Sequence, residues 1–136
     1  MSSGSAKSLF LSVPSRLDAL GPIRGRVLDY VGQLGFAEQA AEDLVLCVHE
    51  AVSNAIVHGN REAEELPVDV LIEALDGGVR VTVRNHGPGF EFDQLADRRP
   101  TDEPRGRGMK IIRSLAADIA WNDQGRELVF VMQAPR

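Results

Sequence analysis

The chain contains few of the residues that would assign it to several large classes of protein. Its 136 residues include one cysteine, and aromatic residues make up 5%. A single thiol excludes a disulfide framework within the chain, and Cys47 lies in an apolar helical pattern typical of a small core residue. Basic residues (15) are outnumbered by acidic ones (20), which gives a formal net charge of −5. That sign argues against nonspecific binding to nucleic acid or to an anionic membrane, and it favours a partner with a basic patch.

Long apolar runs are also missing. No stretch approaches the roughly 18 residues that a transmembrane helix requires. The first 13 residues, MSSGSAKSLFLSV, lack the long apolar core and the cleavage pattern of a signal peptide. The length and the ordinary apolar and charged content predict one cytoplasmic domain spanning residues 1–136, without membrane or direct nucleic-acid contacts.

The spacing of apolar residues predicts an α+β fold. Its elements follow the order β-α-α-β-β-loop-α-β-β, which favours a two-layer sandwich with a mixed, mostly antiparallel sheet and helices on one face. The predicted helices span 15–34, 37–58 and 109–119. Ser15 is the expected N-cap of the first helix, although Gly21-Pro22 can delay its regular start, and Gly35 and Gly59 are the expected stops of the first and second helices. The predicted strands span 7–13, 67–75, 78–85, about 119–122, and 127–133.

Glycines mark two kinds of connection. Asp76-Gly77-Gly78 separates two alternating segments, which indicates a tight hairpin because glycine supplies the positive φ that such turns need. Residues 86–108 contain four glycines, three prolines and many charges, which predicts a long loop. Loops of that length in a compact domain are usually functional or disordered.

The segment HEAVSNAIVHGN (49–60) places three polar side chains four residues apart in an apolar run. On an α-helix, positions four apart drift by only about 40°, so Glu50, Asn54 and His58 are expected to share one stripe. A lone Glu or Asn on a helix most often lies on a solvated face. The stripe therefore needs support from other segments before it indicates a site.

Two glycine-rich segments give that support. NHGPGF (85–90) follows a predicted strand, and its glycines either let backbone approach a ligand or form a plain turn. RGRGMKIIRSL (105–115) places Gly106 and Gly108 directly before a helix, where free N–H groups and the helix dipole favour an anion such as phosphate. Each segment alone is a weak signal.

Taken in order, these three segments resemble the N, G1 and G2 boxes of the GHKL ATPase/kinase superfamily. That superfamily includes histidine-kinase catalytic domains, gyrase and the large heat-shock chaperone. Its small size and the segment EAVSNAIVHG (50–59) make the chain most similar to the anti-sigma factor serine kinases of the RsbW and SpoIIAB type. The resemblance covers about residues 9–133, and it implies the Bergerat (GHKL) fold with ATP and Mg²⁺ as cofactors.

The resemblance also implies a role for each matched residue. Glu50 is expected to take the proton from a serine hydroxyl, and Asn54 to coordinate the Mg²⁺ that bridges the phosphates. His58 is expected to be structural. Residues 91–108 are expected to form a lid over the triphosphate. The other nucleotide-binding residues are expected to be Asn85, Gly87, Gly89, Arg105, Gly106 and Gly108.

Two kinds of partner follow from the resemblance alone. They are a sigma factor and an anti-anti-sigma protein of the STAS class, which would be phosphorylated on a serine and would exchange with the sigma factor by partner switching. The resemblance further implies pairing of two chains into a homodimer. The predicted first helix carries Arg16, Arg24 and Arg26, which form either a docking face or a solvated face.

Two positions depart from the family pattern. The family has an aspartate at the position of Asn85, where it accepts the adenine amino proton, and a threonine where this chain has Gly125-Arg126-Glu127. These departures leave two functional hypotheses. One is a kinase with weaker nucleotide binding, and the other is a nucleotide-independent adaptor or anti-sigma protein. A detached histidine-kinase catalytic domain is less favoured, because no phosphoacceptor helix is expected before the first strand.

Overall fold

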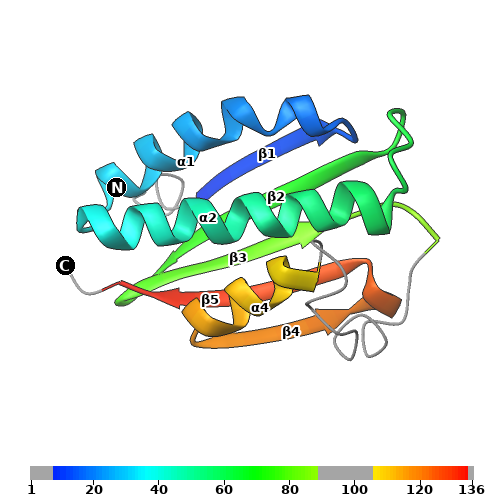
Figure 1. Cartoon of the computed structure of the whole chain (residues 1–136). Helices are drawn as coiled ribbons and strands as arrows, with labels where there is room; N and C mark the ends of the chain where they lie inside the picture. Colours follow the sequence, from blue (N-terminus) through cyan, green and yellow to red (C-terminus); the bar gives the residue numbers. More distant parts are fainter. Residues whose placement is uncertain (1–7, 89–105, 135–136) are drawn as a thin grey trace.

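The computed structural model describes residues 8–88 and 106–134. It is the predicted α+β sandwich, in which one sheet is covered on one face by helices (Figure 1). The strands are β1 (Ser8–Pro14), β2 (Pro67–Leu75), β3 (Gly78–Arg84), β4 (Asp118–Asn122) and β5 (Glu127–Gln133). The α-helices are α1 (Gly21–Gln33), α2 (Glu38–Asn54) and α4 (Gly106–Leu115), and η2 (Leu17–Ala19), η3 (Ala55–Gly59) and η4 (Asp123–Gly125) are short turns.

The sheet has the strand order β1-β2-β3-β5-β4. All four pairings between the described strands are antiparallel, so the expected mostly antiparallel sheet has no parallel pair in this part of the chain. Along one cross-strand row Ile72 pairs with Val81, which pairs with Phe130 on the other side. All three side chains are fully buried beneath the helices. The predicted hairpin is confirmed, with Gly77 at φ 86° in the turn between β2 and β3.

Helix α2 is the centre of the helical layer and lies between α1 and α4 (Figure 1). Its buried face contains Leu44, Val48 and Val52 at the predicted spacing. Cys47 is fully buried in the same core, as predicted. Removing such apolar side chains from water is the main source of stability in a domain of this size.

The predicted cap of the first helix is wrong, whereas the delay of its regular start at Gly21-Pro22 is confirmed. Ser15 does not cap it; its hydroxyl donates instead to the carbonyl oxygen of Leu66 (2.5 Å). A 3₁₀ turn follows, and α1 begins only at Gly21, with Pro22 in its first turn, where a missing N–H costs nothing. The end is as predicted, since Gly35 follows the helix at φ 82°.

The last helix is shorter than the predicted 109–119 at its C-terminal end. It ends at Leu115, because the backbone N–H groups stop donating to the helix after Ala116. The Ala116 N–H still donates to the Ile112 carbonyl, whereas the Ala117 N–H donates to the carbonyl of Val131 in β5 (2.8 Å). This change of partner brings the chain into the sheet at β4.

Asn60 joins several segments of the chain at the edge where α2 finishes. Its side chain is 1% exposed. The two hydrogens of Nδ2 are shared among three acceptors, Ser15 Oγ (2.8 Å) and the carbonyl oxygens of Leu66 (3.1 Å) and Pro67 (2.9 Å), while Oδ1 accepts the amide N–H of His86 (2.8 Å). One buried amide therefore holds the ends of β1 and β3 and the start of β2 beside the turn after α2.

Replacement of Asn60 by aspartate should strongly destabilise the protein, although the two side chains have nearly the same size. Asn60→Asp puts a carboxylate oxygen against two carbonyl oxygens, so we expect the free energy of unfolding in urea to fall by more than about 3 kcal/mol. Ser15→Ala removes one acceptor of Asn60 and one donor to the Leu66 carbonyl but adds no charge, so it should cost only about 1–2 kcal/mol. An Asn60→Asp loss no larger than that of Ser15→Ala would contradict this role.

The thiol of Cys47 should make the stability of the protein fall at alkaline pH. Burial raises the pKa of the Cys47 thiol to about 12, and the Asp43 and Glu50 carboxylates add to the shift. An unfolded thiol titrates near about 8.5, so the stabilisation is complete below that pH and is lost as the pH rises towards 12. We expect urea unfolding between pH 8.5 and 10.5 to show a decline of up to about 1.4 kcal/mol per pH unit. Cys47→Ala should lack this component, and identical slopes for the two proteins would contradict it.

Candidate functional site

The last turns of α2 contain the candidate base and the candidate metal ligand. Glu50 is half-buried, and Asn54, one turn later on the same face, is only 4% exposed. The two side chains therefore form a line that runs from the surface of the helical layer towards its interior. That arrangement allows a buried group to bind a ligand while the carboxylate remains accessible to a second reactant.

The helix changes geometry directly after Asn54. The sequence predicted an α-helix through His58, but residues Ala55–Gly59 form a π turn, in which the Asn60 N–H donates to the Ala55 carbonyl (2.8 Å). The wider turn removes His58 from the predicted α-helical spacing with Asn54. It also places Asn60 where its side chain reaches the strands. Single π turns of this kind occur often at functional sites.

Gly59, Asn85 and Gly87 meet where β3 ends. A Cβ atom added to Gly59 would collide with the side-chain amide of Asn85, and one added to Gly87 would collide with the Gly59 carbonyl oxygen. Both glycines are therefore required by close approach of the π turn to the segment after β3. This contact brings two of the predicted nucleotide-binding residues, Asn85 and Gly87, next to the end of the α2 segment.

The Asn85 amide is oriented by its neighbours. The side chain is 3% exposed, its Oδ1 accepts the Gly87 N–H (3.1 Å), and its Nδ2 donates to the Gly125 carbonyl oxygen (3.3 Å). A flipped amide would oppose donor to donor and acceptor to acceptor, so the partners fix which atom points where. Oδ1 keeps a second lone pair, which is the feature that an adenine amino group would need.

Arg126 stands where the family pattern has a threonine, and it connects two loops. Its Nε donates to the Gly87 carbonyl (2.9 Å) and its Nη2 to the Pro88 carbonyl (3.0 Å). Nη1 lies within hydrogen-bonding distance of Asp123 and Gln124 in the turn before β5. That turn includes two non-glycine residues at positive φ, Asp123 at 53° and Gln124 at 57°, an uncommon backbone conformation that costs free energy. The guanidinium thus fixes a strained turn against the segment that follows β3.

Asn54 has an unsatisfied polar atom. Its buried Nδ2 has no hydrogen-bond partner within residues 8–88 and 106–134. Such a group costs about 1–3 kcal/mol unless a ligand or water completes its bonds. Because a side-chain amide offers both an oxygen and an NH₂ group, Asn54 fits a site that holds Mg²⁺ together with phosphate oxygens.

The glycines before the last helix occupy its first turn. Gly106 and Gly108 lie at the N-terminal end of α4, and Ile112 anchors this helix in the core beside α2 (Figure 1). The N-terminal amides of an α-helix have no partners within the helix, and they carry the positive end of its dipole. Gly89 and Arg105, the other predicted binding residues, lie outside the described residues. The predicted lid, 91–108, also lies outside them up to residue 105.

The sequence reasoning missed the structural roles of two polar residues and a glycine. Asn60 directly follows the helix-ending Gly59, and a polar residue with no place in the apolar pattern is the only local signal that it has. Arg126 was noted for the threonine that it replaces, although its own side chain makes the contacts. Gly59 was interpreted as a helix stop rather than as a point of close approach.

Two features are absent from the described residues. Within them, no group of three or more His, Cys, Asp or Glu side chains is placed to hold a metal ion. No helix in this part of the chain has the length and apolar character to cross a bilayer. Mg²⁺ commonly takes one or two protein ligands and keeps several waters, so a single amide oxygen such as that of Asn54 is compatible with a magnesium site.

The chain belongs to the histidine kinase-like ATPase domain family, whose model matches residues 13–132. Within this family it is similar to the serine-protein kinase RsbW of Oceanobacillus iheyensis, with 22% identity over 84% of this chain and 78% of the relative. RsbW of Bacillus subtilis is 29% identical over 62% of this chain, which spans about half (52%) of that relative. The resemblance to RsbW-type proteins that the motifs predicted is thereby confirmed.

A further relative and a solved structure are consistent with this family and this fold. The anti-sigma F factor of Clostridium botulinum (strain Eklund 17B) is 28% identical over 67% of this chain and 67% of the relative. Among solved structures, the RsbU and RsbW domains of a Mycobacterium tuberculosis protein superimpose with a TM-score of 0.65 at 18% identity. That match covers 95% of this chain and 32% of the other, and it supports the fold alone.

The orientation of the Asn85 amide predicts that aspartate, the residue of the family pattern, would destabilise this chain at position 85. Asn85→Asp would place a carboxylate oxygen opposite the Gly125 carbonyl, so we expect the free energy of unfolding at pH 7 to fall by about 1–3 kcal/mol. The deficit should shrink near pH 4, because a protonated carboxyl can donate to that carbonyl. Chemical unfolding at both pH values measures this.

A matched variant separates the hydrogen bond from the added charge. Gln124→Glu adds the same charge to the turn that Asn85 contacts at Gly125, but it keeps an oxygen that accepts from Arg126 Nη1, which lies 3.3 Å away in the native pair. We expect this control to unfold like the wild type. Equal stability of Asn85→Asp and the wild type at pH 7 would show that the amide orientation does not matter.

Proposed function

We propose that this chain is an ATP-dependent protein-serine kinase that controls a sigma factor. The observation that carries the proposal is the buried Asn54 amide, which lacks a partner for Nδ2 among the described residues and lies one turn beyond the half-buried Glu50. A buried amide with an unsatisfied atom lowers stability, so its place beside an accessible carboxylate supports a ligand site.

ATP would bind between the end of α2, the Gly59–Gly87 contact and the N-terminus of α4. Asn85 and Gly87 would hold the adenine end, and Gly106 and Gly108 would offer backbone N–H groups to the phosphates. Asn54 would ligate Mg²⁺, which neutralises charge on the transferring phosphoryl group when bound. Gly89, Arg105 and a lid over 91–108 would complete the site, within a single domain spanning the chain.

Glu50 would act as the general base. As the serine hydroxyl attacks, its proton passes to the Glu50 carboxylate, the bond from the serine oxygen to the γ-phosphorus forms, and the bond from that phosphorus to the ADP oxygen breaks. Little covalent chemistry is required of the protein in such a transfer, so positioning and charge neutralisation supply most of the rate. The half-buried position of Glu50 leaves one side open to a protein substrate.

The names of the relatives suggest the partners. Some are called serine-protein kinase RsbW and another anti-sigma F factor. These names support a serine-containing protein substrate and a sigma factor as partners. From the motif resemblance we further propose that the substrate is an anti-anti-sigma protein of the STAS class, with phosphorylation deciding which partner is held. The net charge of −5 is compatible with a partner that has a basic patch.

A nucleotide-independent binding module is the second candidate. Asn85 stands where the family has an aspartate, and both of its polar atoms already bond to protein groups. If adenine cannot use the remaining lone pair of Oδ1, the same surfaces would bind partners without ATP. Intact Glu50 and Asn54 favour the kinase.

Replacement of the proposed base should separate binding from chemistry. In Glu50→Gln we expect phosphate transfer from labelled ATP to a purified STAS-domain protein of the same organism to fall by about 10²–10⁴-fold, since general bases contribute that much. Mg-ATP affinity, measured by titration, should change less than about threefold, because the carboxylate is proposed to contact the serine rather than the nucleotide.

Glu38→Gln is the control, since this glutamate is exposed in the first turn of the same helix. It should transfer phosphate like the wild type. Unchanged transfer by Glu50→Gln would refute the role of the base. Failure of the wild type to bind ATP would leave the binding module as the function.

A further inference from the structure

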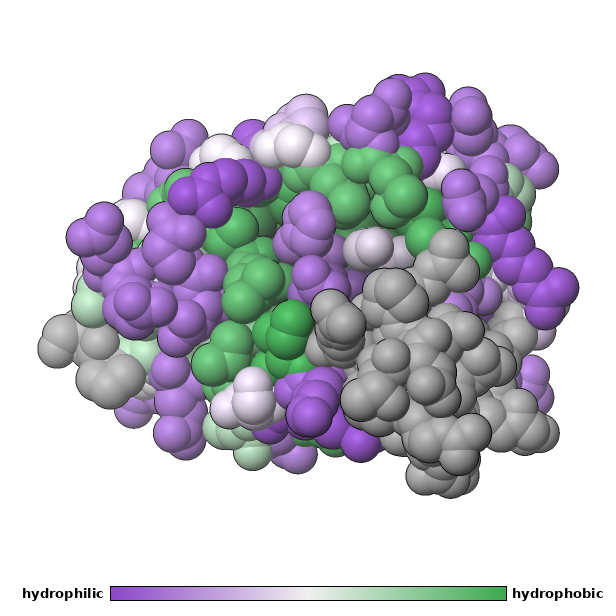
Figure 2. Space-filling view, in the orientation of Figure 1, coloured by the Kyte–Doolittle hydropathy of each residue, from purple (hydrophilic) through white to green (hydrophobic). Residues whose placement is uncertain are grey.

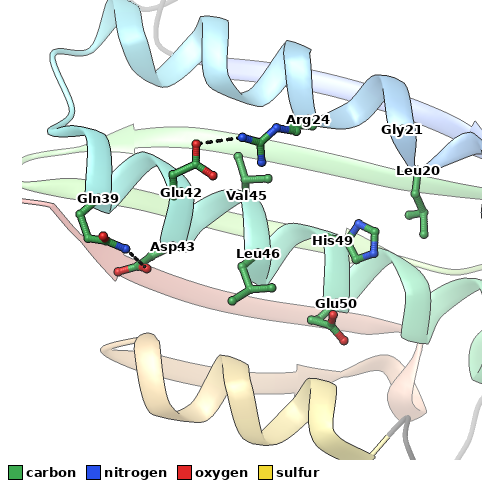
Figure 3. Close-up of a pocket in the computed structure, with 10 residues that line it drawn as sticks. All are labelled: Leu20, Gly21, Arg24, Gln39, Glu42, Asp43, Val45, Leu46, His49 and Glu50. Atoms are coloured by element: carbon green, nitrogen blue, oxygen red, sulfur yellow. Dashed lines mark hydrogen bonds and ion pairs between the residues drawn. The ribbon is translucent and has the colours of Figure 1, made fainter.

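A shallow groove lies on the outer surface of the helical layer. It follows the outward face of α2 beside the start of α1 and encloses about 630 Å³ (Figure 3). We call it the α1–α2 groove; its lining includes Leu20, which directly precedes α1, Arg24 from α1, and Asp43, Leu46, His49 and Glu50 from α2. The groove shares Glu50 with the candidate catalytic site but includes neither Asn54 nor Asn85. It therefore leads from open surface to the proposed base.

Three groove residues lie in a row that points to the catalytic site. Asp43, Leu46 and Glu50 project from the same side of α2 (Figure 3). With a rise of 1.5 Å per residue, Leu46 lies about 6 Å and Asp43 about 10.5 Å from Glu50 along the helix axis. An extended chain advances about 3.3 Å per residue, so these spacings correspond to about two and three residues of a bound segment. Because side chains alternate along an extended chain, the residue three away leaves the opposite side of the segment, and only a long side chain such as arginine or lysine reaches round to Asp43.

The charges of the groove are mostly negative. Arg24 is offset by Glu42, because its Nη2 lies 2.9 Å from Glu42 Oε2 across the groove. Asp43 accepts only a neutral donor in the groove, Gln39 Nε2 (2.9 Å). The Asp43 and Glu50 carboxylates are thus not offset by Arg24, and a cationic side chain is the complementary partner for Asp43.

The middle of the row is apolar. Leu46 is 41% exposed, which is high for a leucine between two half-buried acids. Figure 2 shows apolar surface between hydrophilic side chains on this helix-bearing face. A single exposed leucine is ordinary on a protein surface. Leu46 lies between Asp43, whose carboxylate is not paired with Arg24, and the proposed base Glu50. It can therefore contact the part of a bound segment that lies between those two acids.

We propose that the α1–α2 groove binds the substrate segment around the acceptor serine. The serine hydroxyl lies at Glu50, an apolar side chain about two residues away lies on Leu46, and an arginine or lysine about three residues away pairs with Asp43. This proposal rests on the proposed kinase function and specifies the chemistry of its substrate.

A peptide library with a fixed central serine tests the groove directly. Each sub-library fixes one residue type at one position, from three before to three after the serine, and its affinity for the full chain is measured by fluorescence anisotropy. At the position three residues from serine on one side, basic residues should bind about three- to tenfold tighter than acidic ones, the range of a partly exposed ion pair and its repulsive counterpart. Asp43→Lys should invert that preference.

Asp29→Lys is the matched control, because it makes the same change on an exposed α1 residue outside the groove lining. It should keep the wild-type preference. Leu46→Glu should remove the apolar preference two residues from serine. Absence of a basic preference, absence of any measurable peptide binding, or an equal response to Asp43→Lys and Asp29→Lys would overturn the proposal.

Phosphate transfer to the same peptides distinguishes this failure from failure of the proposed function. Peptides that bind with the expected preference but receive no phosphate would leave the groove as a docking site and refute the kinase. Peptides that receive phosphate without charge preference would support the kinase and refute the groove. A Mg-ATP titration of each variant reports whether its nucleotide site is intact.

Discussion

The buried amide of Asn60 is the constraint on which the arrangement of the candidate site depends. It donates to the start of β2 and to Ser15 after β1, and it accepts the backbone N–H of His86. Since His86 stands between Asn85 and Gly87, this last bond fixes the segment that packs on Gly59. A side chain with no contact to a reactant therefore sets where the strand end meets the helix. Loss of such a buried partner costs more than an exposed contact of the same length, because the orphaned groups cannot reach water.

Around this anchor the structure assembles two lines of polar groups. One follows α2 from the α1–α2 groove through Glu50 to the buried Asn54, and the other crosses from Gly87 through Asn85 to the turn before β5. Arg126 holds the second line in place with a guanidinium that reaches the carbonyls of Gly87 and Pro88. The two departures from the family pattern thus form one connected unit. In this account Asn85 and Arg126 are mutually fitted, and aspartate at the first position would disturb the fit.

The sequence predicted most of the fold because its strongest patterns are local. The alternation over 67–75 and 78–85 and the helical spacing of Leu44, Val48 and Val52 depend only on which face is buried. Element ends were predicted less well. The π turn after Asn54 depends on Asn60 bonding to distant strands, and Ser15 is drawn from capping by the carbonyl of Leu66. Arg126 reaches backbone more than thirty residues away in sequence, a contact that no local pattern contains. The family motifs predicted where the candidate site lies. The hydrogen bonds within it, such as those of Asn60, Asn85 and Arg126, could be seen only in the structure.

The kinase proposal depends on Asn54, whose buried Nδ2 has no partner in the part of the chain that the structure describes, being part of a working nucleotide site. Calorimetric titration of ATP into the full chain, with Mg²⁺ present, tests it most directly when Asn54→Ala is measured alongside. The account predicts saturable binding of one ATP per chain and a loss of about tenfold or more in affinity for Asn54→Ala, the usual cost of removing one buried partner. No binding by the wild-type chain, or equal affinity in the variant, would contradict it.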